Sequence, residues 1–239
     1  EHAMADNEAK ILQEYYAQTA ESYDQMHLGE DPEHDFAMDV MIGLLRHLEV
    51  RTILDVGSGT GRVIMDVQQA MPEVRVVGLE PAEGLRKIGY QKGIPEDQLI
   101  DGDATAMDFK DGEFDLVCAF AVLHHIREPN RAVSEMLRVA SKAVFISDAN
   151  SFGQGSPIAR CMKQTLRALG LWPVFDYIKT GGKGYRISDE DGLAYSYSVF
   201  DSYPMVRRAS RTVHLINTRN ASGVNPYRSA SHVAMLGIK

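Results

Sequence analysis

Short apolar runs alternate with amphipathic segments through the middle of the chain. The runs that read as buried strands are residues 52–56, 74–80, 99–100, 114–120 and 143–147. The segments with apolar residues at helical spacing are residues 63–70, 84–91 and 131–139. Strands that alternate with helices in this way predict βαβ units and a mostly parallel, doubly wound α/β sheet.

The pattern changes at both ends of this alternation. Residues 7–23 and the segment after Pro32 are predicted helices, the second with an apolar stripe of Phe36, Val40, Leu44, Leu45 and Leu48. Residues 212–217 and 232–238 have no helical segment between them, which predicts an antiparallel pair at the sheet edge and seven strands in all. Glycine clusters and one helical run at 158–169 predict a helical cap inserted at 149–200.

We therefore expect one domain over residues 1–239. Its predicted parts are N-terminal helices at 1–50 that partly lid the ligand, a ligand-binding core at 51–148, the cap at 149–200, and a final helix with edge strands at 201–239.

The composition of the chain limits the kinds of binding partner that we expect. The net charge is −8, which argues against nucleic acid, and the cluster Arg207, Arg208 and Arg211 reads as a solvated helix face. Two cysteines give neither a disulfide framework nor a metal site. The chain has no apolar run of membrane-spanning length and no signal sequence, so we expect a cytoplasmic protein without a membrane partner.

A glycine-rich turn follows the first predicted strand. Gly57, Gly59 and Gly61 alternate with Ser58 and Thr60, and Arg62 follows. Such a turn brings backbone N–H groups close to a ligand, and the alternative is that it is only a tight strand-to-helix turn. The spacing lacks the third glycine of a dinucleotide fingerprint, which disfavours the rival assignment, an NAD-dependent oxidoreductase.

Acidic residues follow the neighbouring strands. Glu80 ends the second strand, where a carboxylate accepts hydrogen bonds from ribose hydroxyls, and Asp103 follows the third, where it could read an adenine edge. Asp55 precedes the first glycine and could hold the turn or a cationic group. Each could be an ordinary surface carboxylate, but together they indicate one crevice for an adenosine with an amino-acid tail.

These motifs resemble the class I S-adenosylmethionine-dependent methyltransferases, nearest to the small-molecule type 11 group. The resemblance covers roughly residues 10–150 and rests on segments 53–62, 79–81, 102–104, 114–117 and 122–126. It implies S-adenosylmethionine as cofactor, S-adenosylhomocysteine as product and no metal. The cofactor residues that it implies are Tyr16, Tyr23, Asp55, Gly57, Ser58, Gly59, Gly61, Glu80, Pro81, Asp103, Ala104, Thr105, Ala119 and Phe120.

By the same resemblance the glycines flank the methionine moiety, Glu80 takes the ribose and Asp103 the adenine amine. Ala104 supplies a backbone contact, and Ala119 accepts from the amino group. The turn at 140–142 is shorter than the usual Pro-Gly-Gly turn, and 149–200 matches no family pattern, so the acceptor cannot be carried over.

Methyl transfer is an in-line displacement that needs alignment, and it needs a base only when the nucleophile is a hydroxyl. His125 lies where related enzymes carry a histidine near the acceptor, although it could instead cap or pack the following helix. His124 is a structural or adenine-flanking candidate. Asp148 and Asn150 could orient a polar acceptor or serve as turn residues.

Two further groups could shape the acceptor site. Tyr16 or Tyr23, with His27 a weaker candidate, could close over the sulfonium or simply pack on a helix. In the cap, a sugar, an anionic group or a nucleotide-linked acceptor would suit the mixture of aromatic and cationic residues, although surface solvation also explains the cations. These residues are Lys183, Tyr185, Arg186, Tyr195 and Tyr197.

The predicted function is S-adenosylmethionine-dependent transfer of a methyl group to a small polar acceptor, by O-methylation of a sugar or natural product. The alternatives are N-methylation of a small amine and a catalytically silent protein that binds the cofactor as a regulator.

Overall fold

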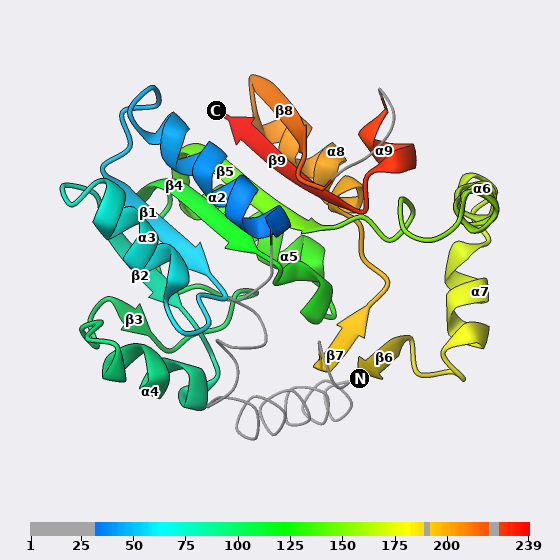
Figure 1. The fold of residues 1–239 in the computed structure, drawn as a ribbon, viewed down its shortest axis with the longest axis horizontal. Coiled ribbons are helices and arrows are strands. Elements are labelled where there is room, and N and C mark those ends of the chain that lie inside the picture. Colours follow the sequence, from blue (N-terminus) through cyan, green and yellow to red (C-terminus); the bar gives the residue numbers. More distant parts are fainter. Residues whose placement is uncertain (1–31, 189–191, 220–224) are drawn as a thin grey trace.

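The structure is a computed structural model that describes residues 32–188, 192–219 and 225–239 (Figure 1). The predicted helix at 7–23, with Tyr16 and Tyr23, and the candidate His27 lie outside the described residues.

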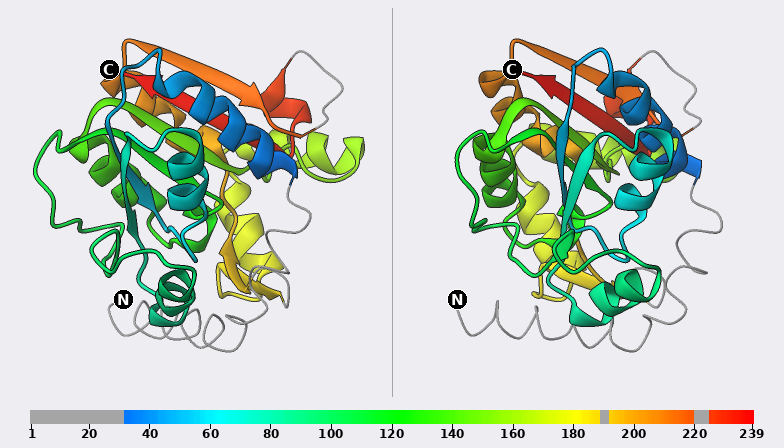
Figure 2. Two further views of the ribbon diagram at one scale, coloured as in Figure 1. Left: turned by 60° about the vertical axis from the view of Figure 1, so that its left-hand side comes forward. Right: turned by 90° about the vertical axis from the view of Figure 1, so that its left-hand side faces the viewer.

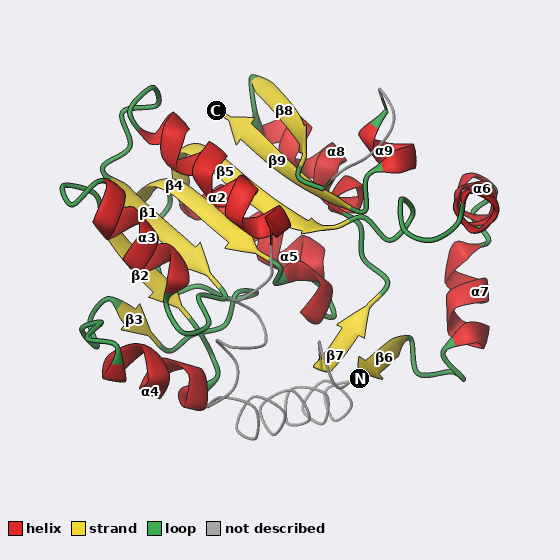
Figure 3. Ribbon diagram, viewed as in Figure 1, coloured by secondary structure: helices red, strands yellow, loops and turns green. Residues whose placement is uncertain are grey.

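A seven-stranded sheet in the order β3-β2-β1-β4-β5-β9-β8 forms the centre of the molecule (Figure 3). Strands β1 to β5 are parallel, and β9 is antiparallel to both β5 and β8. The doubly wound sheet with an antiparallel pair at one edge is therefore confirmed, and the reversed strand is the penultimate one. The strands are β1 (Thr52–Val56), β2 (Arg75–Leu79), β3 (Leu99–Ile100), β4 (Phe114–Phe120), β5 (Ala140–Ala149), β8 (Thr212–Asn217) and β9 (His232–Ile238).

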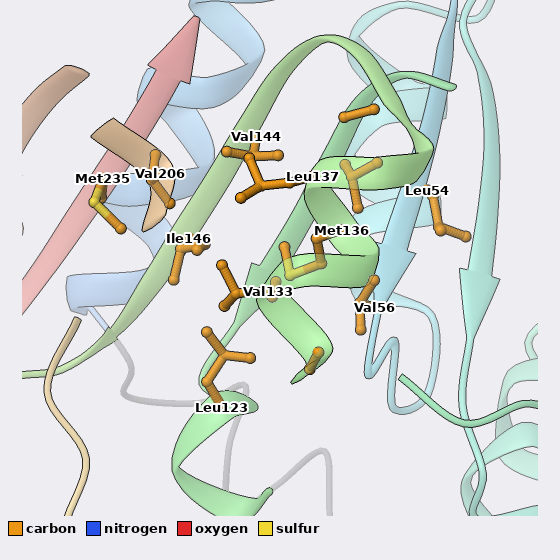
Figure 4. Close-up of a cluster of buried hydrophobic side chains, with 14 of the residues drawn as sticks. Leu54, Val56, Leu123, Val133, Met136, Leu137, Val144, Ile146, Val206 and Met235 are labelled. Atoms are coloured by element: carbon orange, nitrogen blue, oxygen red, sulfur yellow. The ribbon is translucent and has the colours of Figure 1, made fainter. Parts of the chain in front are cut away.

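The central strands are continuous apolar runs because helices cover both faces of the sheet. Leu54 and Val56 of β1 belong to one core, whereas Ile53 belongs to the other. The first core lies against α5 (Pro129–Val139) and α8 (Val199–Ala209), and Figure 4 shows Val133 and Met136 of α5 packed there. The second lies against α2 (Pro32–Leu45) and α3 (Arg62–Ala70). Two separate cores on either side of one sheet make it a rigid platform for loops at the strand ends.

The predicted stripe on and after α2 packs against the second core except at Phe36. Leu45 is buried, and Val40, Leu44 and Leu48 are partly buried against that core. Phe36 is 47% exposed, and the buried positions are Ala37, Met38, Met41 and Leu45. These four positions recur at spacings of three and four, so they lie together on the helix. At this end of the helix the smaller Ala37, rather than Phe36, is buried in the core.

The cap contains two helices and a two-stranded hairpin (Figures 1 and 2). Helix α6 (Pro157–Ala168) matches the predicted helical run, and α7 (Trp172–Lys179) follows it. The hairpin of β6 (Tyr185–Ser188) and β7 (Gly192–Tyr195) is antiparallel and separate from the main sheet, and the sequence did not predict it. Figure 1 shows this hairpin on the side of the sheet toward which β4 points, and β7 contacts the turn at Leu123–His125 that follows β4. The remaining elements are α4 (Glu83–Gln91), a 3₁₀ turn η1 (Leu123–His125) and α9 (Pro226–Ser229).

Candidate active site

The register of the sheet brings the predicted ligand residues to one edge. Val56 pairs with Leu79 of β2 and with Ala119 of β4, and Leu79 pairs with Ile100 of β3. The residues after these pairs therefore leave the sheet at the same level. Parallel sheets bind ligands in the crevice beyond such strand ends. The predicted residues of the glycine turn, Glu80, Pro81, Asp103, Ala104, Thr105, Ala119 and Phe120 all lie at or just beyond this level.

The glycine turn has a backbone that only glycine adopts readily. Gly57, Gly59 and Gly61 have φ angles of 70°, 56° and 87°, in the left-handed region. A side chain at Gly57 would overlap Val122, and one at Gly61 would overlap Ile94. The turn is thus shaped by its own neighbours and forms the entry to α3, whose first flanking residue is Gly61.

Glu80 joins the glycine turn to the loop after β2. Its carboxylate accepts hydrogen bonds from the backbone N–H of Gly59 at 2.9 Å and from that of Ala82 at 2.8 Å. Burial raises the pKa of Glu80 to about 7, against the effect of those two N–H donors. A carboxylate has about four acceptor positions, so this group retains capacity for ligand hydroxyls.

Asp55 lies within β1 and is 2% exposed. Its Oδ1 atom accepts a hydrogen bond from the Cys118 thiol at 3.6 Å, and Oδ2 has no hydrogen-bond partner among the described residues. Burial raises the pKa of Asp55 to about 6, against the lowering effect of the nearby Ser58 hydroxyl and the Cys118 thiol. A buried carboxylate oxygen without a partner is costly, and a ligand that donates to it would relieve that cost.

Asp103 and Thr105 form a turn just after β3. The Asp103 carboxylate accepts from the backbone N–H of Thr105 at 2.7 Å and from its hydroxyl at 2.8 Å. Asp103 is exposed and Ala104 is half-buried. Across the crevice, Ala119 is buried and Phe120 packs on Phe145 of β5 with ring centroids 5.6 Å apart.

His124 and Asp148 form a close pair at the ends of β4 and β5. The His124 Nδ1 atom lies 2.6 Å from Asp148 Oδ1, and the two side chains are 12% and 1% exposed. The backbone N–H groups of Leu123 and Ala149 also donate to this carboxylate, at 2.8 and 2.6 Å. Burial raises the pKa of Asp148, but His124 and these donors outweigh it, and the net result is a lowered pKa. Asp148 is therefore ionised and orients the imidazole.

His125 is turned toward the cap. Its Nδ1 atom donates to the carbonyl of Leu193 in β7 at 2.7 Å, and its ring lies 4.0 Å from that of His124. The bond attaches η1 to the hairpin. His125, which was predicted as the leading base, thus contacts the cap backbone, whereas its neighbour His124 is hydrogen-bonded to the Asp148 carboxylate.

A second polar cluster beside Asp148 was missed by the sequence reasoning. His34 of α2 lies 3.2 Å from the Ser147 hydroxyl, and Glu33 lies 3.0 Å from Arg219 and 3.6 Å from His232. Burial lowers the pKa of His34. The sequence does contain a signal for this cluster. Glu33 and His34 precede Ala37 and Met38 by four residues each, so they share the buried face of α2.

A cavity of about 570 Å³ lies between the sheet ends and the cap. We call it the cap cavity. Ala121, His124 and Ala149 line it from the sheet, and residues of α6, α7 and the hairpin line it from the opposite side. Of the predicted cap residues, Tyr185, Arg186, Tyr195 and Tyr197 line the cavity. Lys183 is exposed and does not line it.

Asn150 has a role that neither prediction described. Its side chain donates to the carbonyls of Tyr227 and Ala230, at 3.0 and 2.9 Å, and accepts from the Ser198 hydroxyl at 2.8 Å. It therefore joins β5 to α9 and to the start of α8.

No group of three His, Cys, Asp or Glu residues in the described part of the chain is arranged to hold a metal ion. Among the helices that the structure describes, none has the length and apolar character needed to cross a membrane.

Comparison with known proteins agrees with this geometry. Residues 54–146 match the family model described as a methyltransferase domain. The chain is 39% identical over 87 residues to the demethylmenaquinone methyltransferase of Renibacterium salmoninarum, a match that spans 36% of this chain and 35% of that protein. It is 29% identical over 204 residues to the demethylmenaquinone methyltransferase of Roseiflexus castenholzii, which covers 77% and 83% of the two chains.

A structural relative extends over the whole fold. The magnesium protoporphyrin IX methyltransferase of Synechocystis, crystallised with S-adenosylhomocysteine, superposes with a TM-score of 0.61 at 15% identity. The superposition covers 97% of this chain and 99% of that one. The fold is thus shared with that methyltransferase. Together with the match of residues 54–146 to a methyltransferase domain and with the sequence relatives, it supports S-adenosylmethionine-dependent methyl transfer as the activity of this chain.

Proposed function

We propose that this chain transfers a methyl group from S-adenosylmethionine to a hydroxyl oxygen of a small polar acceptor, such as a sugar or a natural product, held in the cap cavity. The observation that carries the proposal is the position of His124. It lines that cavity, it lies in the η1 turn that follows β4 at the cofactor crevice, and a buried aspartate orients it.

The crevice suits the cofactor. When bound, S-adenosylmethionine supplies a methyl group on a sulfonium, so the protein has only to align the acceptor and remove its proton. Glu80 retains acceptor capacity for the ribose hydroxyls, and the partnerless Asp55 oxygen suits a cationic group or a donor of the amino-acid tail. The glycine turn and Ser58 would border that tail. Asp103, Ala104 and Thr105 would hold the adenine, with Pro81, Ala119 and Phe120 forming the remaining walls.

His124 is the proposed general base. Because the ionised Asp148 accepts a hydrogen bond, Nδ1 of His124 carries the proton, and Nε2 is the nitrogen that takes a proton from the acceptor hydroxyl. This is the arrangement in which a carboxylate fixes the tautomer and stabilises the imidazolium that forms. His125 would act as a positioning residue that keeps η1 against the cap.

Turnover of labelled S-adenosylmethionine tests the proposal. The acceptor panel contains sugars, phenols and small amines, with a demethylmenaquinone analogue included because the two sequence relatives are named for that substrate. We expect His124→Gln to lower kcat at least about a hundredfold while S-adenosylhomocysteine affinity stays unchanged. Asp148→Asn should lower kcat as well, since it leaves the imidazole tautomer unfixed.

His47→Gln is the matched control, because His47 is exposed and lies far along the chain from both strand ends. Near-normal turnover in His124→Gln would contradict the base and favour N-methylation, in which alignment alone suffices. Tight binding of S-adenosylhomocysteine without a labelled product from any acceptor would favour the silent cofactor-binding protein.

A further inference from the structure

The cap carries a small excess of positive charge within an acidic protein. Residues 149–200 contain six lysine and arginine residues and four acidic ones, Asp176, Asp189, Glu190 and Asp191, whereas the whole chain carries a net charge of −8. Surface solvation would explain scattered cations on an outer face. It does not explain cations that meet on one wall of a cavity.

Three of these cations line the cap cavity from three different elements. Lys163 belongs to α6, Lys179 ends α7, and Arg186 lies on β6. The Lys163 amino group also bonds to the carbonyl of Ser151, which fixes it at the base of the cap. The fold thus brings together side chains that are 16 and 7 residues apart in sequence, and their common feature is positive charge.

Their proximity raises the free energy of the cavity wall when no ligand is bound. Burial lowers the pKa of Lys163, and repulsion from Lys179 and Arg186 lowers it further. Asp176 lies 3.9 Å from the Arg186 guanidinium and compensates one charge only. The other acid of the cavity, Glu33, is already paired with Arg219 on the sheet side. Among the described cap residues that line the cavity, positive charge is therefore in excess.

Aromatic side chains line the cavity along with the cations. Trp172 is largely buried, and its indole N–H donates to the Ser196 hydroxyl at 3.1 Å. Tyr185 and Tyr195 face each other edge to face, with ring centroids 6.2 Å apart. All three line the cavity. Such a wall suits a flat or apolar body between two polar ends.

We propose that the acceptor carries an anionic group, a carboxylate or a phosphate, which Lys163, Lys179 and Arg186 bind on the cap side of the cavity. The inference rests on the proposed function and narrows its acceptor to an anionic compound. Arginine pairs with such groups through two parallel hydrogen bonds, and the lysines add charge without directional demand. The hydroxyl to be methylated then points toward the sheet side, where His124 lies.

The single tryptophan of the chain reports on this cavity directly, because Trp172 lines it. Intrinsic fluorescence is therefore titrated with 4-hydroxybenzoate and phenyl phosphate as anionic probes, and with 4-hydroxybenzamide as the neutral analogue. We expect a saturable change with one or both anions, at least about tenfold weaker binding of the amide, and loss of affinity as salt is raised.

Arg186→Gln and Lys179→Gln should each weaken the anionic probe at least about threefold. Both side chains are exposed, so neither substitution removes core packing. Lys183→Gln is the matched control: it removes the same charge from the same segment at an exposed residue that does not line the cavity, and wild-type affinity is expected.

Equal binding of the anionic and neutral probes, or wild-type affinity in both variants, would overturn the anionic subsite. Calorimetry with S-adenosylhomocysteine separates this result from failure of the proposed function. Normal cofactor binding with no selectivity for anions refutes the subsite alone, whereas absence of cofactor binding refutes the methyl transfer on which it rests.

Discussion

At the scale of the residue, the crevice depends on two buried carboxylates that are costly to ionise. The pKa of Asp55 is raised to about 6 and that of Glu80 to about 7, both chiefly by burial, and Asp55 adds to the rise at Glu80 by repulsion. A ligand that brings hydroxyl donors and positive charge favours the ionised forms. Cofactor binding and release of these protons are therefore linked.

This linkage predicts a pH-dependent affinity for S-adenosylhomocysteine. If the ligand requires ionised Glu80, affinity should rise about tenfold from pH 6 to pH 8, as a group with a pKa of about 7 loses its proton. Glu80→Gln should bind about 1–3 kcal/mol more weakly at pH 8 and show a flatter profile. Calorimetric titration at both pH values measures this.

Glu96→Gln, at an exposed position, is the control for that experiment and should keep the wild-type profile. An affinity for S-adenosylhomocysteine in the wild type that is constant over this range would show that Glu80 does not have to ionise.

Residue-scale sequence reasoning located the site better than it assigned the roles within it. Glu80 and the glycines are identified by their position after a strand, which is a local signal. Which of His124 and His125 faces the cavity is not local: they are consecutive in a 3₁₀ turn, so their side chains diverge by about a third of a turn. Only the positions of Asp148 and Leu193 distinguish them.

At the scale of the element, the predictable strands are those buried on both faces. The strand predicted at 114–120 has the observed bounds of β4, because every residue from Leu116 to Ala119 is buried and the run is uninterrupted. The hairpin of β6 and β7 was missed because most of β6 is exposed, so no alternation of apolar and polar residues marks it. Its position depends on contacts with the η1 turn, which no local pattern encodes.

The Asn150 side chain links β5 to α9 and to the start of α8 by hydrogen bonds. Replacement by alanine leaves the carbonyl of Ala230 and the hydroxyl of Ser198 without this buried partner, and we expect a loss of roughly 2–4 kcal/mol in the free energy of unfolding. Urea denaturation followed by circular dichroism measures it. Asn130→Ala, at an exposed residue of α5, is the control and should change stability by less than about 0.5 kcal/mol. A similarly small change in Asn150→Ala would contradict the bridging role.

At the scale of the whole molecule, buried titratable groups give stability opposing dependences on pH. The pKa of His34 and that of His232 are lowered mainly by burial, so their contribution is lost as pH falls below their ordinary value of 6.5. Asp55 and Glu80 act in the opposite direction. Because folding raises their pKa values, they stabilise the folded state at low pH, where they are protonated, and this contribution is lost as pH rises. The pH dependence of the free energy of unfolding of one protein combines these effects. Comparing the wild type with a variant that lacks one group separates the contribution of that group.

The difference between wild type and Glu80→Gln isolates one group. Folding raises the pKa of Glu80 from 4.5 to about 7, so its stabilising contribution is present at low pH and is lost as pH rises through 7. From pH 5 to pH 8, the free energy of unfolding of the ligand-free wild type should therefore fall by about 2–3 kcal/mol more than that of Glu80→Gln. Urea titrations of both proteins at each pH measure this. If the free energies of unfolding of the two proteins change in parallel with pH, Glu80 keeps an ordinary pKa in the folded protein. Because the ligand favours ionised Glu80, saturating S-adenosylhomocysteine should raise wild-type stability more at pH 8 than at pH 5.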